Sequence, residues 1–72
     1  MSTCQVKLNG IEAVKDFVNT LKNADGDFEL VSGKYVIDAK SIMGIFSLDL
    51  TRPIELRTET GMIPAAVAPF LA

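Results

Sequence analysis

Residues 40–48 read Lys40-Ser41-Ile42-Met43-Gly44-Ile45-Phe46-Ser47-Leu48, and this stretch decides the expected fold. Ser41 suits the N-cap of a short helix, because a serine side chain can accept a hydrogen bond from a free first-turn N–H. Ile45 and Leu48 lie three residues apart, so both would face the core from that helix. Met43 and Phe46 are also three apart and would share a different face.

The residues before this stretch predict a strand and then a helix. Val6 and Leu8 alternate with polar neighbours until Asn9-Gly10, which is typical of a half-buried strand. The next apolar residues have helical spacing and form one stripe: Ile11, Val14, Phe17, Val18 and Leu21. Glu12 near the start of this segment and Lys22 near its end suit the helix dipole.

A hairpin is expected between this helix and residues 40–48. Phe28 and Leu30 alternate with acidic neighbours, and Tyr35-Val36-Ile37 is rich in strand-forming residues. Ser32-Gly33-Lys34 between them is a turn signal. The two segments therefore predict an antiparallel pair.

The residues after Leu48 predict a connection, a fourth strand and a weak helix. Pro53 ends the connection 49–53, since proline can start a strand but not occupy its centre. Ile54 and Leu56 then alternate with charged residues. In the tail, Ile63, Val67 and Phe70 have helical spacing, although Pro69 interrupts it.

The element order is thus strand, helix, strand, strand, helix, strand, short helix, within one domain spanning residues 1–72. Mixed elements with a hairpin favour an α+β fold, in which helices cover one face of a four-stranded antiparallel sheet. Cys4, the only cysteine, is expected to be a small buried hydrophobic residue on the first strand.

Residues 40–48 resemble the second-helix segment of HPr, the phosphocarrier of the phosphoenolpyruvate-dependent sugar phosphotransferase system. The resemblance covers about residues 4–60 and includes Gly10-Ile11, which is similar to the start of the family's phosphorylation motif. It implies the HPr-like open-faced β-sandwich, with four antiparallel strands and three helices. That element order agrees with the one predicted above.

The chain departs from the family at the chemical site. HPr carries its phosphoryl group on a histidine at the start of the first helix, and this chain has no histidine. Glu12 lies near that position, and the arginine and proline that follow the family histidine are absent. Imidazole accepts and releases a phosphoryl group near neutral pH, whereas Glu12 has no neighbouring arginine in sequence to hold one. We therefore expect no enzymatic activity.

The resemblance implies two roles for the second helix. Ser41 matches a serine that a dedicated kinase phosphorylates in many Gram-positive relatives; the alternative is that Ser41 only caps the helix. Ile42, Met43 and Phe46 match an exposed apolar patch that docks partner proteins. The alternative for these three residues is that a small protein packs some of them inside.

The interpretation we favour is a non-catalytic HPr-like protein that binds a partner through this helix and is switched at Ser41. The expected partners are a kinase, an Enzyme I-like protein or a transcription regulator. One alternative is a phosphocarrier in sugar uptake that uses a nucleophile other than histidine. Another is a structural subunit of a homo- or hetero-oligomer, which would be favoured if the tail 62–72 leaves part of the sheet uncovered.

Composition narrows the partners and the compartment. The formal net charge is −2, which gives no electrostatic case for binding nucleic acid. A single cysteine, no basic-apolar leader and no long apolar run together favour a cytoplasmic protein without a membrane anchor. Asp25, Asp27, Asp38 and Asp49 are dispersed and show no metal-ligand spacing, so no metal or cofactor is expected.

Overall fold

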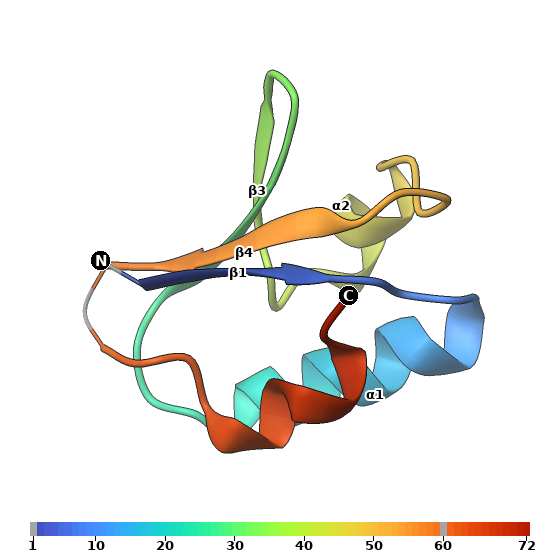
Figure 1. Cartoon of the computed structure of the whole chain (residues 1–72). Helices are drawn as coiled ribbons and strands as arrows, with labels where there is room; N and C mark the ends of the chain where they lie inside the picture. The colour runs from blue at the N-terminus through green and yellow to red at the C-terminus, as the bar shows by residue number, and fades with distance from the viewer. Residues whose placement is uncertain (1, 60) are drawn as a thin grey trace.

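A single antiparallel sheet organises the computed structural model, which describes residues 2–59 and 61–72. Its strands are β1 (Ser2–Val6), β2 (Phe28–Ser32), β3 (Tyr35–Asp38) and β4 (Ile54–Thr58). They lie in the order β1-β4-β2-β3, so β4 occupies an interior position although it comes last in the chain (Figure 1). With three helices, this arrangement is the predicted small α+β fold with an open four-stranded sheet.

The first strand starts and ends earlier than its alternation predicts. β1 pairs with β4 from Ser2 opposite Thr58 to Val6 opposite Ile54. Beyond this point the Lys7 N–H donates to the Phe70 carbonyl at 2.8 Å, so the C-terminal segment takes over the pairing. Leu8 remains fully buried, which explains why its apolar character extends the pattern past the strand.

The hairpin of β2 and β3 has a two-residue loop, Gly33-Lys34, because Ser32 pairs with Tyr35. Gly33 has a φ of 59°. Glycine at the first loop position with positive φ is typical of a type II′ turn, whose twist matches that of the strands. The predicted hairpin is confirmed.

The helix α1 (Ile11–Lys22) buries Val14, Phe17, Val18 and Leu21, as its apolar stripe predicts. The stripe was wrong for Ile11, which is 60% exposed. Ile11 is the first helical residue and follows Gly10 at a φ of 96°, so it lies where the chain is still turning into the helix.

The tail forms a 3₁₀ helix, η1 (Ala65–Phe70), with Pro69 inside it. The ring of Phe70 packs edge-on against Phe17 of α1, with the ring centroids 5.3 Å apart. After η1, the Ala72 N–H donates to the Gln5 carbonyl at 3.0 Å. The tail therefore covers part of the β1 edge.

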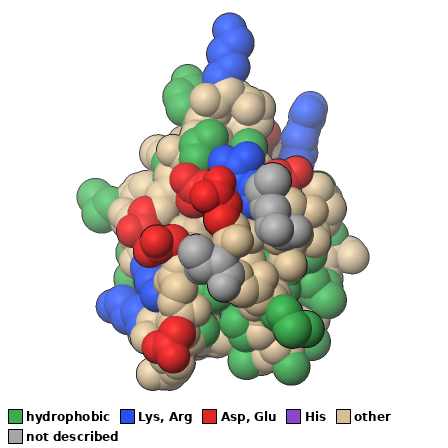
Figure 2. All heavy atoms as spheres, turned by 90° about the vertical axis from the view of Figure 1, so that its left-hand side faces the viewer, with side chains coloured by type: hydrophobic (Ala, Val, Ile, Leu, Met, Phe, Trp, Pro, Cys, Tyr) green, Lys and Arg blue, Asp and Glu red, His purple; other side chains and the backbone are tan. Residues whose placement is uncertain are grey.

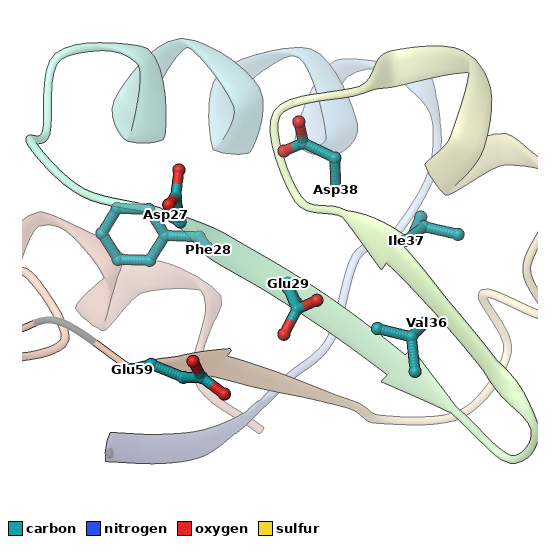
Figure 3. Close-up of a pocket in the computed structure, with 7 residues that line it drawn as sticks. All are labelled: Asp27, Phe28, Glu29, Val36, Ile37, Asp38 and Glu59. Carbon is teal, nitrogen blue, oxygen red and sulfur yellow. The ribbon is translucent and has the colours of Figure 1, made fainter.

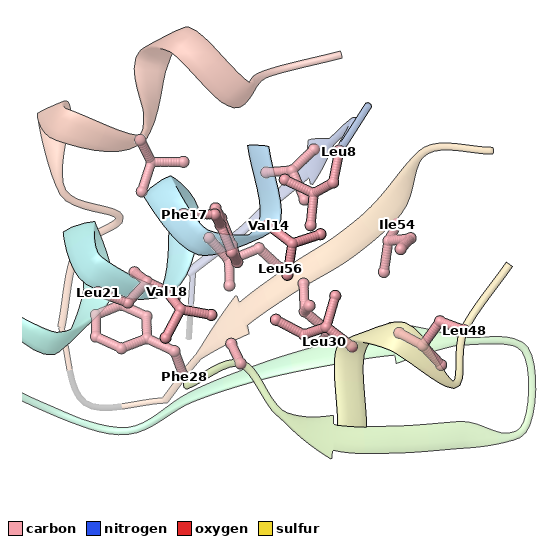
Figure 4. Packing of buried hydrophobic residues seen from close by; sticks show 14 residues of the cluster. Leu8, Val14, Phe17, Val18, Leu21, Phe28, Leu30, Leu48, Ile54 and Leu56 are labelled. Carbon is pink, nitrogen blue, oxygen red and sulfur yellow. The ribbon is translucent and has the colours of Figure 1, made fainter. Parts of the chain in front are cut away.

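One core lies between the sheet and the helices (Figure 4). Alternate residues of β2 and β4 point into it, and Val67 of η1 contributes to it. Its buried hydrophobic members are Val6, Leu8, Val14, Phe17, Val18, Leu21, Phe28, Leu30, Ala39, Ile45, Leu48, Ile54, Leu56 and Val67. Cys4 is only half-buried and packs against this core, so the expectation of full burial was wrong.

The opposite face of the sheet carries the residues that alternate with the core residues along each strand, and charged side chains are among them. The Arg57 Nη2 donates to Glu29 Oε1 across β4 and β2 at 3.1 Å. Both side chains are partly exposed, so this ion pair contributes at most about 1 kcal/mol. Separately, none of the helices within residues 2–59 and 61–72 has the length and apolar character that a membrane span requires.

Candidate functional site

The short helix α2 (Ile42–Phe46) begins at a well-formed cap. Ser41 has an extended backbone, and its Oγ accepts a hydrogen bond from the Gly44 N–H at 3.2 Å. The Ser41 carbonyl accepts the Ile45 N–H at 3.0 Å. The side chain of Ser41 thus satisfies a free N–H of the first turn and its carbonyl accepts the first intrahelical hydrogen bond, so the predicted N-cap is confirmed.

Two faces of α2 are distinct in burial. Ile45 is fully buried, as predicted; Leu48 is also almost buried at 9% exposure, but α2 ends at Phe46, so the prediction that Leu48 lies on the helix was wrong. Met43 is 81% exposed and Phe46 is 41% exposed. Ile42 is half-buried and packs against the core, so it offers less free surface than the sequence suggested. The candidate docking surface, defined here as Ile42, Met43 and Phe46, therefore has two exposed members and one that is partly covered.

Lys40, two residues before α2, binds backbone carbonyls from a distant part of the chain. Its Nζ donates to the carbonyls of Ala24 and Gly26, each at 3.2 Å. The same Nζ lies 5.5 Å from the centroid of the Phe28 ring, within cation–π range. Lys40 thus links α2 to the connection between α1 and β2. Sequence pattern predicts no role for Lys40, because only the folded chain brings the α1–β2 connection close to it.

Gly44 allows a close approach between α2 and β3. A Cβ at this position would lie 3.2 Å from Ser41 Oγ and 3.3 Å from Ile37 Cδ1. Those separations are tighter than ordinary van der Waals contact, so a side chain at this position would require Ser41 or Ile37 to shift by a few tenths of an ångström. The docking surface is consequently presented on a helix held at its cap, at Lys40 and at Gly44.

The entry of α1 is formed by Gly10, Ile11 and Glu12. Gly10 provides no side-chain cap, and Glu12 is exposed in the first turn. Within residues 2–59 and 61–72, no hydrogen bond or ion pair joins Glu12 to another side chain. Of the two arginines, Arg57 pairs with Glu29 and Arg52 lies in the connection before β4. An acyl phosphate on Glu12 would have no basic partner of this kind.

Two hollows have linings that include none of the three docking-surface residues. The first, of about 400 Å³, is lined by Asp27, Phe28, Glu29, Val36, Ile37, Asp38 and Glu59 (Figure 3). The second, of about 730 Å³, lies between the hairpin tip and the connection before β4, and includes Lys34, Tyr35, Ser47 and Arg52. The carboxylates of the first hollow are not arranged as metal ligands, and no such group of three occurs elsewhere in the described part of the chain.

Two titratable groups are shifted by their surroundings. Burial raises the pKa of the Cys4 thiol, which makes it a poor nucleophile near neutral pH. Hydrogen bonds from the Thr51 side chain and backbone lower the pKa of the Asp49 carboxyl, with smaller contributions from Arg52 and Lys7. Neither group lies among the residues of the candidate docking surface.

Comparisons of this chain with protein-family models, with curated proteins and with solved structures found no match.

Proposed function

We propose that this chain is a non-catalytic HPr-like protein that binds a protein partner through α2. The observation that carries the proposal is the 81% exposure of Met43, two residues before the fully buried Ile45. Phe46 adds a second exposed apolar side chain on the same short helix. Adaptable methionine beside an aromatic ring is a composition that protein contacts favour.

Rigid presentation of this surface supports the proposal. The cap at Ser41 and the two hydrogen bonds of Lys40 hold α2 from its N-terminal side. Ile45 holds it from the core. A surface fixed before binding loses less conformational entropy when a partner docks, so even a small patch can bind usefully.

Phosphorylation of Ser41 would act as the switch on this surface. Its Oγ is half-buried and engaged with the Gly44 N–H, so a phosphate would replace the cap with a dianion at the first turn. That charge would lie two residues from Met43. It would therefore change the electrostatic environment of the docking surface without requiring α2 to unfold.

The proposal includes the absence of phosphoryl transfer. Incubation with labelled phosphoenolpyruvate and Enzyme I should leave the chain unlabelled, because Glu12 lacks the imidazole chemistry and, within residues 2–59 and 61–72, is not ion-paired with an arginine. A wild-type histidine-containing HPr is the positive control. Stoichiometric label on Glu12, located by mass spectrometry, would instead establish the phosphocarrier alternative.

The docking role is tested by titrating the ¹⁵N-labelled chain with purified Enzyme I, a serine kinase of the HPr type and a transcription regulator from the same host. Met43→Glu should weaken binding to the partner that perturbs α2. Met62→Glu is the matched control, because Met62 is 84% exposed and lies outside α2. Equal effects of the two substitutions, or chemical-shift changes that avoid α2 for every partner, would refute the proposal.

A further inference from the structure

The two edges of the sheet differ in whether another segment of the chain pairs with them. The β1 edge is covered by the C-terminal segment, through hydrogen bonds at Gln5 and Lys7 and a bridge between Val6 and Leu71. At the other edge lies β3, and within residues 2–59 and 61–72 it pairs only with β2. Tyr35 is 70% exposed and Val36 is 49% exposed, so this edge is open to solvent. An open edge strand is a template for pairing with another chain.

The free backbone groups on this edge follow from the register of the hairpin. The Ala39 N–H donates to the Phe28 carbonyl at 3.0 Å, and hydrogen-bonded pairs alternate with non-hydrogen-bonded ones in an antiparallel ladder. Val31 opposite Val36, and Glu29 opposite Asp38, are the non-hydrogen-bonded pairs. The N–H and C=O of Val36 and the N–H of Asp38 therefore point away from β2, toward the open edge.

We propose that β3 pairs antiparallel with β3 of a second copy of this chain, about a two-fold axis that passes beside Val36. In this register Val36 faces its own symmetry mate and exchanges two hydrogen bonds with it. Lys34 then faces Asp38 of the other copy, and this pair occurs twice. Tyr35 faces Ile37 on the inner face of the sheet, also twice. The sheet would continue across both copies.

Charge complementarity selects this register. Lys34 is exposed in the loop directly before β3, and Asp38 at the far end of β3 belongs to the hollow that Asp27, Glu29 and Glu59 also line (Figure 3). Figure 2 shows acidic side chains gathered on the side of the molecule where β1 begins and β4 ends. The two-fold pairing brings the lysine of each copy toward the acidic hollow of the other. Opposite charges on facing strands favour pairing, whereas like charges oppose it.

This interface is small, because β3 has only four residues. Interfaces at the low end of the size range are weak and form mainly at high concentration. Sedimentation equilibrium of the full chain, over about 0.05–1 mM, should show a reversible monomer–dimer equilibrium, since Kd values in this range need only modest binding energy. The Val36 amide should become protected from hydrogen exchange as the dimer forms.

Charge variants test the register. Lys34→Glu places like charges opposite each other twice and should weaken dimerisation by about tenfold or more. Lys15→Glu is the control, because it makes the same change in net charge on the exposed side of α1. The double variant Lys34→Glu with Asp38→Lys exchanges the partners and should recover much of the lost affinity. Melting temperatures confirm that each variant is folded.

A backbone variant tests the edge itself. Val36→Pro removes the N–H that would cross the interface, while the β2–β3 ladder loses no hydrogen bond. It should abolish the dimer. The proposal is overturned if the wild-type chain stays monomeric at 1 mM, if Lys34→Glu and Lys15→Glu act alike, or if Met43→Glu rather than Val36→Pro removes the dimer. The last result would place self-association on α2.

Discussion

Two substitutions on α2, one buried and one exposed, test whether only the buried side of this helix contributes to stability. Ile45 is fully buried, so Ile45→Ala removes a packed side chain and leaves a cavity in the core. Comparable truncations cost about 2–5 kcal/mol. A domain of this length is stable by about 4–11 kcal/mol, so the variant loses a large part of its free energy of unfolding. Met43→Glu changes a side chain that is 81% exposed and should alter stability by about 0.5 kcal/mol or less.

Urea unfolding followed by circular dichroism measures both free energies. At about 4–8 °C per kcal/mol for a domain of this size, Ile45→Ala should also lower the melting temperature by at least roughly 8 °C. Met43→Glu should shift it by a few degrees at most. Leu48→Ala is a second core variant, since Leu48 is also buried. If Met43→Glu destabilises the chain as much as Ile45→Ala, Met43 belongs to the core, and the docking proposal loses its main support.

Further substitutions test the cap, the anchor and one shifted carboxyl. Ser41→Ala should cost about 0.5–2 kcal/mol and abolish labelling by a cognate kinase, whereas Ser41→Asp should retain most of the stability; label that survives Ser41→Ala would disprove the site. Lys40→Met should cost about 1–2 kcal/mol in urea unfolding by removing two charge-assisted hydrogen bonds, while Lys15→Met, on the exposed face in the middle of α1, should cost almost nothing. Thr51→Val should raise the pKa of Asp49 in an NMR titration, because it removes the hydroxyl hydrogen bond that contributes most to the low value. The stabilisation associated with a lowered carboxyl pKa is present above the unfolded-state pKa and is lost as pH falls through the folded-state value, so Thr51→Val should flatten the acid side of the stability profile.

Local pattern was sufficient for most elements of this chain. The spacing of Val14, Phe17, Val18 and Leu21 fixes the buried face of α1, because a helix returns to the same face every three to four residues. Likewise, the cap and the buried side of α2 follow from the positions of Ser41 and Ile45, although the helix ends before Leu48. The same spacing identified Met43 and Phe46 as residues of another face, which the structure leaves exposed.

Long-range contacts decided what local pattern could not. Ile11 fits the apolar stripe but lies at the helix entry, and Leu8 stays buried outside the strand whose alternation it continues. The tail ends on the β1 edge, and Lys40 reaches carbonyls of the α1–β2 connection. Periodicity specifies which side of an element is apolar, whereas strand order, register and tertiary hydrogen bonds depend on which distant segments meet. That is why the sequence determined the elements and the faces of α2, and only the folded chain showed that β3 is the edge left open.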